Sequence, residues 1–437
     1  KTKNLWLLAA LGFIVFVAVQ LFPTTDSESL QLQQSNEVIS KQEAAASASE
    51  FVQSVLGIDL PNPAKDKALI TYETRSDLFG YLTKADLLAP YLKTYDKQFP
   101  YDVFRVRYPN PTEALSAVTV DVHMTTGKVV GFEEISSSSN ATKQMMLDVG
   151  SETTDSMKAW EGDLTLAEKE ELAQPYLNAF GFQPSDLELA SGEGDVGLLY
   201  RIQGYTLGES QAEIKLSFEY GKVSSLESYF SVPQAHLDYV AGQTKIASWL
   251  TYAGYALLTF VLAILAIVYS ALTRVHTSFK RGIFLASAYF VLSTIGTINM
   301  IPVFQKDGLE AGVLVFGLFF QGLVTLFLAA SVYFSLVGGD GLWRKNGINL
   351  WARSREEGYG RSILTSVGDG YAWALILLGV QSVVFFILEQ TIHTWSTTDA
   401  TQSPYNMVYP VLFPLLAWVA GIGEEAVYRL FGIPMLK

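Results

Sequence analysis

The sequence contains no cysteine and only four histidines among its 437 residues. The missing cysteines exclude a disulfide framework, a thiolate nucleophile and a cysteine-ligated zinc site. His123 and His236 lie far apart without carboxylates at ligand spacing, and His393 lies 31 residues before the acidic motif described below. We therefore expect His123 and His236 to be ordinary surface or core residues and His393 to play no catalytic part.

Positive charge is scarce in one part of the chain only. Residues 24–240 contain 33 acidic and 16 basic residues, a net charge of −17, whereas the remainder contains 10 acidic and 14 basic residues, a net charge of +4. An acidic soluble segment beside a basic apolar one argues against nucleic acid as a partner. The charge distribution instead favours a soluble domain joined to a membrane domain.

Long apolar runs stand on both sides of the acidic segment. They cover residues 5–22, 246–272, 283–301, 311–337, 371–388 and 407–436. A helix of about 20 residues crosses a hydrocarbon core of roughly 30 Å, so each run reaches or nearly reaches spanning length. No clear signal-peptidase site follows the first run. The sequence predicts an uncleaved anchor at residues 1–23 and five spans within residues 241–437.

Basic residues gather in alternate loops between these runs. Residues 273–282 and 338–368 contain eight lysines and arginines, whereas residues 302–310 and 391–406 contain one lysine. The positive-inside rule then places the two basic loops in the cytoplasm and the acidic domain outside. We expect a multi-pass protein of the cell membrane, in contact with the lipid bilayer. At the ends of the spans we expect turns, and not metal or phosphate sites, at residues 339–341 and 368–370, both Gly-Asp-Gly.

The acidic segment contains a diverged internal repeat. Each copy opens with an amphipathic helix that a glycine closes, residues 42–56 before Gly57 and residues 166–180 before Gly181. The first copy is assigned to residues 24–140 and the second to residues 141–240. The serine-rich residues 136–140 are expected to link the two copies.

Strands follow the helix in each copy. We expect them at residues 68–73, 103–108, 117–123 and 129–133, and then at residues 197–203, 212–220 and 223–230. Alternation such as Val118, Val120 and Val122 is typical of half-buried strands. Gly127 and Gly221 each begin a Gly-Lys-Val hairpin turn. The predicted fold class is a polytopic α-helical membrane bundle plus an α+β extracytoplasmic domain of two helix-plus-antiparallel-sheet repeats.

This order of helix and strands resembles the PepSY-type module. The resemblance rests on the Gly-Lys-Val turns and on the strand order. Such modules are associated with binding or restraining peptidases, so the resemblance implies a sensor or autoinhibitory role. A plain structural ectodomain is the other interpretation, since a fold by itself does not give a function.

Two carboxylates and a guanidinium lie inside the last apolar run, in the sequence GIGEEAVYRLFGIP of residues 421–434. Ionisable groups at membrane depth are costly and usually functional. On a helix, Glu425 and Arg429 lie on one face as i and i+4 and can neutralise each other. Glu424 points about 100° away. A carboxylate in a poorly solvated pocket has a raised pKa and can act as a general base, so Glu424 is the candidate catalytic group.

The spacing Glu-Glu-x-x-x-Arg resembles the first motif of the CAAX protease and bacteriocin-processing family of intramembrane endopeptidases. The resemblance covers about the last seventy residues, so the protease domain would begin near residue 370. It implies metal-free chemistry without a cofactor, with Glu424 activating a water and Glu425 and Arg429 supporting it. It also implies two later motifs, Phe-x-x-x-His and His-x-x-x-Asn or Asp, which residues 1–437 do not match. We therefore expect this chain to be truncated after the first motif and inactive alone.

The leading hypothesis is an intramembrane endopeptidase that cleaves a peptide or a membrane protein. The alternative is a non-catalytic membrane sensor or scaffold, whose outer repeats bind a ligand or regulate a partner and whose Glu–Arg pair is structural. A transporter is a third possibility, because charged residues in helix bundles also mark ion paths. No inverted repeat is visible among the spans, which disfavours the transporter.

Overall fold

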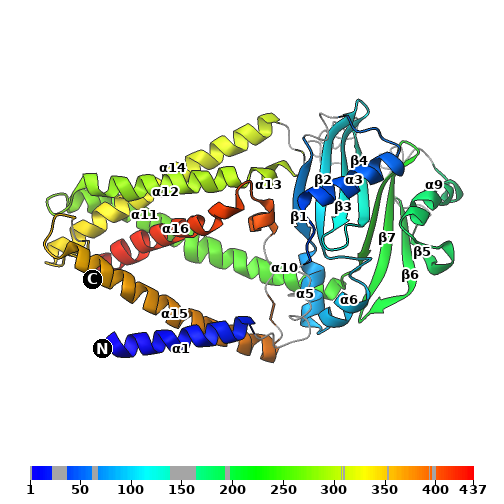
Figure 1. Ribbon diagram of the computed structural model, residues 1–437. Coiled ribbons are helices and arrows are strands. Elements are labelled where there is room, and N and C mark those ends of the chain that lie inside the picture. Colours follow the sequence, from blue (N-terminus) through cyan, green and yellow to red (C-terminus); the bar gives the residue numbers. More distant parts are fainter. Residues whose placement is uncertain are drawn as a thin grey trace.

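A sheet domain and a group of apolar helices occupy opposite ends of the molecule (Figure 1). The computed structural model describes residues 2–21, 37–61, 67–137, 164–191, 197–306, 308, 311–351, 354–392, 394–395 and 400–437. The long helices run away from the sheet domain, and both marked chain ends lie at the far end. The predicted combination of an α+β domain with apolar helices is confirmed. The expected boundary between the repeats, at residues 140 and 141, lies outside the described residues.

Eight antiparallel strands form one continuous sheet in the order β1-β2-β3-β4-β8-β7-β6-β5. The strands are β1 (Leu69–Thr74), β2 (Asp102–Thr112), β3 (Leu115–His123), β4 (Val129–Ser136), β5 (Leu187–Ser191), β6 (Leu198–Leu207), β7 (Ser210–Glu219) and β8 (Lys222–Phe230). Each copy of the repeat is a four-stranded meander, and the last strands of the two copies pair with each other. The repeat therefore builds a single sheet with approximate twofold order.

The two meanders meet at a short and close strand pair. Residues 131–133 of β4 pair with residues 225–227 of β8. A Cβ atom at Gly131 would lie 3.1 Å from the carbonyl oxygen of Leu226, so glycine lets the strands approach. The Ser228 hydroxyl adds a hydrogen bond to the Val130 carbonyl at 2.9 Å.

One helix precedes each meander, and both helices begin in the same way. They are α3 (Lys41–Ser54) and α9 (Leu166–Ala179). In α3, the Ser40 hydroxyl accepts from the backbone N–H of Glu43, and the Glu43 carboxylate accepts from the backbone N–H of Ser40. Thr165 and Glu168 repeat this arrangement at α9. Such a capping box satisfies two backbone donors that a helix start leaves unpaired.

Both helices cover one face of the sheet. The ring of Phe51 on α3 lies 5.7 Å from that of Phe132 on β4 and 5.5 Å from that of Phe180, just after α9. Val118, Val120 and Val122 of β3 are fully buried, as their alternation predicts. Burying apolar side chains from both copies in one core makes the sheet domain a single packed unit.

Three elements of the sheet domain were not predicted. They are α5 (Ser76–Lys84), α6 (Leu88–Thr94) and the edge strand β5. Each has at most nine residues, too few for a clear periodic pattern. Tertiary contacts hold the short helices instead. Tyr91 of α6 is fully buried, with its ring 5.3 Å from Phe230 and its hydroxyl donating to the Phe99 carbonyl.

Six helices in the described part of the chain are long and apolar enough to cross a membrane. They are built from α1 (Thr2–Leu21), the continuous run α10 (Gln234–Trp249), η2 (Leu250–Ala256) and α11 (Leu257–Leu272), α12 (Phe279–Asn299), α14 (Ala311–Lys345), α15 (Tyr359–Ile392), and the last span, which begins at η5 (Pro410–Leu412) and α16 (Phe413–Glu424). The number and order of the predicted apolar spans are confirmed as helices.

The helices pack as two groups. The first is the pair α1 and α15, where small residues let the backbones touch. A Cβ atom at Gly12 would lie 2.4 Å from the carbonyl oxygen of Leu375, and one at Gly379 would lie 2.5 Å from the Cα atom of Gly12. Ala9 and Ala372 are fully buried in this part of the chain. The second group is α14 with α11, α12 and the last span.

The prediction of turns at the two Gly-Asp-Gly motifs is wrong. Residues 339–341 lie inside α14 and residues 368–370 inside α15. In α14 the glycines permit close packing, since a Cβ atom at Gly341 would lie 2.1 Å from the hydroxyl of Thr273, the residue that follows α11. Asp340 is buried, accepts a hydrogen bond from Arg344 at 3.0 Å and pairs with Arg281 of α12 at 3.4 Å.

A histidine at the end of β3 is buried in the sheet domain. His123 is 2% exposed, and its Nδ1 atom accepts from the backbone N–H of Thr125 at 3.1 Å. Its Nε2 atom lies 3.6 Å from the Asp96 carboxylate. Burial lowers the pKa of His123 from 6.5 to about 4; Asp96 opposes this shift, whereas Lys128 and Lys97 add to it.

We predict that His123 makes the sheet domain less stable at pH 5 than at pH 7. The unfolded chain binds a proton at His123 near pH 6.5 and the folded chain only near pH 4. Between pH 7 and pH 5 this difference lowers the free energy of unfolding by about 2 kcal/mol. Hydrogen exchange of the β2 and β3 amides in the full chain measures the loss.

The control is His123→Gln, and the quantity compared is the loss of stability between pH 7 and pH 5 in the variant and in the wild type. Burial raises the pKa of Asp102 to about 6 and that of Glu134 to about 7, and these carboxyls have the opposite pH dependence. They are present in both proteins and cancel in the comparison. Equal pH dependence of the two proteins would contradict the role of His123.

Candidate functional site

The predicted motif lies where the last span changes its helical geometry. α16 ends at Glu424 and continues as the π-helix η6 (Glu425–Gly432), followed by α17 (Ile433–Met435). Pro434 has no N–H and cannot donate to the carbonyl of Leu430, four residues earlier. The indole N–H of Trp343 on α14 donates to that carbonyl at 2.9 Å instead. Single π-helical turns are rare and are frequent at functional sites.

Glu425 and Arg429 form the predicted i,i+4 ion pair. Arg429 Nη1 lies 2.8 Å from Glu425 Oε2. The side chains are 54% exposed for Glu425 and 70% for Arg429, so the pair lies on the surface of the helix group. Within an apolar span this pairing compensates one of the two carboxylates.

The side chain of Glu424 is exposed and makes no hydrogen bond or ion pair with another described residue. It is the fifteenth residue of the 26-residue span Pro410–Met435. At 1.5 Å per residue it lies about 21 Å from the start of that span, close to its middle. The structure therefore brings Glu425 and Arg429 together and leaves Glu424 uncompensated beside them.

Hydroxyl groups that sequence reasoning missed lie next to the motif. The Tyr428 hydroxyl of η6 is hydrogen-bonded to the Thr259 hydroxyl of α11, and the Tyr428 ring is 6.1 Å from that of Tyr255. Tyr255 also lies within electrostatic range of the Glu424 carboxylate. The i,i+4 spacing of two polar side chains, Tyr255 and Thr259, inside an apolar span is the signal that could have indicated them.

Close packing fixes the helix on both sides of the glutamates. A Cβ atom at Gly423 would lie 3.2 Å from the Tyr289 ring of α12, and one at Gly339 would lie 2.7 Å from the Leu430 carbonyl oxygen. Phe431 is fully buried in the cluster that α11, α14 and η6 share. The motif is therefore held by three neighbouring helices while its acidic side chains remain exposed.

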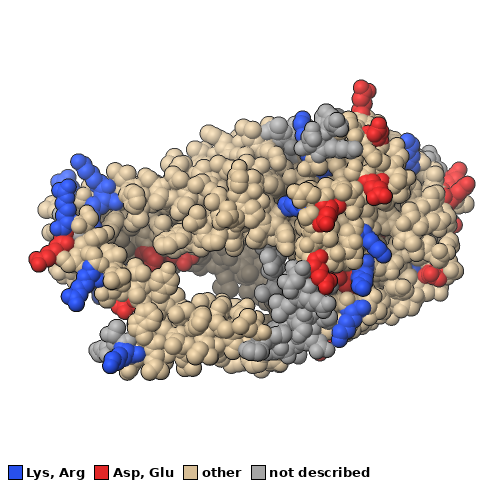
Figure 2. Space-filling view, in the orientation of Figure 1, with Lys and Arg blue, Asp and Glu red and all other residues tan. Residues whose placement is uncertain are grey.

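A hollow separates the α1–α15 pair from the other helices, and acidic atoms lie on its wall (Figure 2). Glu424 and Glu425 are the acidic residues of α16 and η6, and both are exposed. Basic side chains gather at the end of the helices remote from the sheet domain. This end holds the loops after α11 and α14, which the charge pattern of the sequence also distinguishes.

Among the described residues, no three histidine or acidic side chains lie together in a way that could hold a metal ion. His123 is buried in the sheet domain, and His236 is buried at the start of α10, next to that domain. His393 lies outside the described residues.

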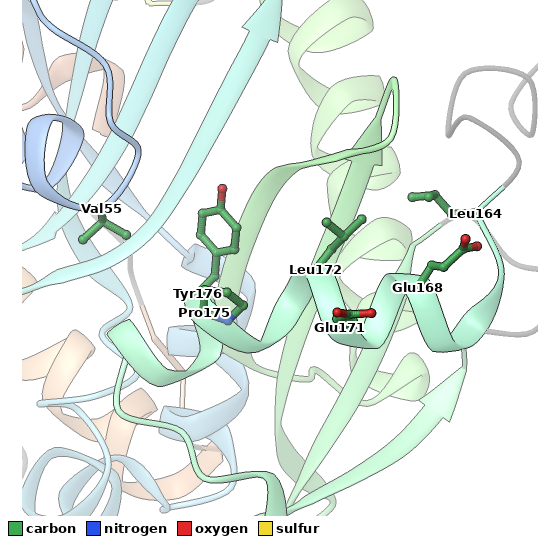
Figure 3. Close-up of a pocket in the computed structure, with 7 residues that line it drawn as sticks. All are labelled: Val55, Leu164, Glu168, Glu171, Leu172, Pro175 and Tyr176. Atoms are coloured by element: carbon green, nitrogen blue, oxygen red, sulfur yellow. The ribbon is translucent and has the colours of Figure 1, made fainter.

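A separate hollow of 640 Å³ lies on the sheet domain. Figure 3 shows it between Val55 and the side chains of α9. The lining is mostly apolar, with an acidic rim, and consists of Val55, Leu164, Glu168, Glu171, Leu172, Pro175 and Tyr176. Glu168 is occupied by its capping box with Thr165, and α9 lies at the far side of the sheet domain from the helices. This hollow is therefore not part of the glutamate site.

The chain matches no protein-family model, no curated protein and no solved structure. The geometry described above is thus the basis for any assignment of function.

We predict that Gly339→Ala destabilises the packing of α14 on η6. The added methyl group would overlap the Leu430 carbonyl, and overpacking of this kind costs about 1–3 kcal/mol. The thermal unfolding midpoint of the full chain in detergent measures the effect. Gly322→Ala is the matched control on the same helix, because a Cβ atom there meets nothing within 4 Å. Equal midpoints for the two variants would contradict the close contact.

Proposed function

We propose that the chain belongs to an intramembrane endopeptidase similar to the CAAX protease and bacteriocin-processing family. The observation that carries the proposal is the contrast between neighbouring carboxylates. Glu425 is neutralised by Arg429 at 2.8 Å, whereas Glu424 is exposed without a described partner near the middle of a span. A free carboxylate at that depth is costly, and chemistry is a reason to keep it.

In this mechanism Glu424 takes a proton from a water, and the resulting hydroxide attacks the carbonyl carbon of a scissile amide. The proton then passes to the leaving nitrogen as the C–N bond breaks. Hydrogen-bond donors must stabilise the oxyanion in between. The hydroxyls of Tyr428, within the motif, and of Tyr255, whose ring is 6.1 Å from that of Tyr428, are candidates. By the resemblance, histidines in motifs that residues 1–437 do not match would complete such a site.

The proposed setting is the cell membrane, with the sheet domain outside and the basic loops in the cytoplasm. The six apolar helices and the basic side chains at their remote end support this orientation. The substrate would be a peptide or a membrane protein that reaches the hollow with acidic atoms on its wall (Figure 2). The mechanism proposed here uses neither a metal nor a cofactor.

A membrane sensor or scaffold without catalysis is the second candidate. The observation that favours it is the direct docking of the sheet domain on the helices, for example by the ion pair between Lys306 and Glu73 at 3.2 Å. A sheet domain held in this way could report a ligand to the helices. In that case the Glu425–Arg429 pair would be structural.

We predict that Glu424→Gln removes proteolysis. The amide cannot accept the proton of the attacking water, and loss of a general base lowers a rate by about 10²–10⁴-fold. The measurement compares the newly formed peptide termini in native membranes that contain either the wild type or the variant. Both are expressed from the natural gene, so that any sequence flanking residues 1–437 is present.

Asp369→Asn is the control, because it removes a carboxylate from another spanning helix, α15. Its cleavage products should equal those of the wild type. Unchanged products in Glu424→Gln would overturn the catalytic role of Glu424. If the wild type forms no products either, the sensor or scaffold becomes the better explanation.

A further inference from the structure

At the β1 edge of the sheet, a side chain makes the backbone hydrogen bonds that a further strand would make. β1 pairs with β2 on one side only. On its other side, the backbone N–H of Tyr72 donates to Asn406 Oδ1 at 2.6 Å, and Asn406 Nδ2 donates to the Tyr72 carbonyl at 2.9 Å. These two bonds reproduce the pair that a neighbouring antiparallel residue would make. Asn406 is 1% exposed and comes from η4 (Pro404–Asn406), shortly before α16.

Further contacts surround this amide. The ring of Tyr405 lies 5.9 Å from that of Tyr72 and 5.8 Å from that of Phe104. The Lys306–Glu73 ion pair links β1 to the segment that follows α12, and α13 (Ile301–Gln305) also contacts β1. The edge strand therefore holds both the end of α12 and the lead-in to α16.

A second asparagine fixes the residues after Asn406. Asn299, the last residue of α12, is 1% exposed. Its backbone carbonyl accepts from the N–H of Val408 at 3.0 Å. Its side chain accepts from the N–H of Tyr409 at 2.6 Å and donates to the Tyr409 carbonyl at 3.2 Å. Only Met407, which is buried, separates the two anchored segments.

The path from the sheet to the glutamates is therefore continuous. After Tyr409 the chain enters η5 and then α16, which ends at Glu424. No irregular stretch that could absorb a movement lies between Tyr409 and Glu424. A shift of β1 would therefore reach the start of α16 through the contacts of Asn406 and Asn299.

We infer that the sheet domain positions α16, and with it Glu424, through the pair of hydrogen bonds between Asn406 and Tyr72. Asn406 is then a positioning residue, and the sheet domain regulates the site by holding or releasing it. The regulatory meaning rests on the proposed endopeptidase function. The mechanical coupling itself can be measured without any activity.

The absence of cysteine in the 437 residues makes a single-cysteine experiment possible. Ala426 of η6 is 3% exposed and packs with Val332 and Leu336 of α14. A thiol introduced by Ala426→Cys should react slowly with a small maleimide in the full chain reconstituted in lipid nanodiscs. Asn406→Leu removes both hydrogen bonds to Tyr72 and a third one, from Asn406 Nδ2 to the Ala400 carbonyl at 2.7 Å. We expect it to raise this labelling rate about tenfold.

Two controls separate coupling from general damage. Asn178→Leu changes an exposed asparagine of α9 and should leave the Ala426→Cys rate unchanged. A thiol at Ala372, buried in α15 outside the anchored path, should label equally with and without Asn406→Leu. A general loss of folding would instead raise both rates.

Equal labelling of Ala426→Cys in the Asn406→Leu and Asn178→Leu proteins would overturn the coupling. If Asn406→Leu fails to fold, Asn406→Asp decides the question, because it keeps the acceptor for Tyr72 and loses the donor. We expect a smaller rise in that variant, and no rise would count against the inference. Since the readout is labelling, an inactive Glu424 would leave the result intact and refute the endopeptidase alone.

Discussion

Backbone groups at the ends of regular elements need hydrogen-bond partners when they are removed from water. In this protein, side chains from distant parts of the chain meet that need. Asn406 hydrogen-bonds to the edge of β1, Asn299 to the loop before α16, and Trp343 to the Leu430 carbonyl, to which Pro434 cannot donate. All three contacts lie along the last span or its lead-in. The position of Glu424 therefore depends on polar contacts at both ends of its helix as well as on apolar packing.

Local signals predicted the sheet domain well where the element and its signal are adjacent in sequence. The hairpin glycines Gly127 and Gly221 do have positive φ angles, and the helix-ending glycines Gly57 and Gly181 do as well. Left-handed backbone of this kind favours glycine whatever the rest of the fold does. The short helices α5 and α6 were missed because a buried ring such as that of Tyr91 finds its partner, Phe230, far along the chain.

The same contrast between local and distant contacts explains which features of the glutamate site could be predicted. The pairing of Glu425 with Arg429 follows from helical spacing alone and was predicted. The hydrogen bond between Thr259 and Tyr428, by contrast, joins residues 169 positions apart. Gly-Asp-Gly is a local turn pattern, so the sequence around Asp340 predicts a turn. In α14 these glycines permit close packing instead. A Cβ atom at Gly339 would overlap Leu430 of η6, and one at Gly341 would overlap Thr273, which follows α11.

The two neighbouring carboxylates of the motif need different explanations. A helix places Glu425 above Arg429, and the ion pair accounts for both residues without any chemistry. Among the residues that the structure describes, no comparable partner accounts for Glu424. An apolar residue at this position would cost less free energy in a membrane than the carboxylate does. A structural role would therefore predict one glutamate beside the arginine, not two. The second carboxylate, held in place by Gly423 against Tyr289 and by the anchored lead-in to α16, is the feature that favours a reaction over a scaffold.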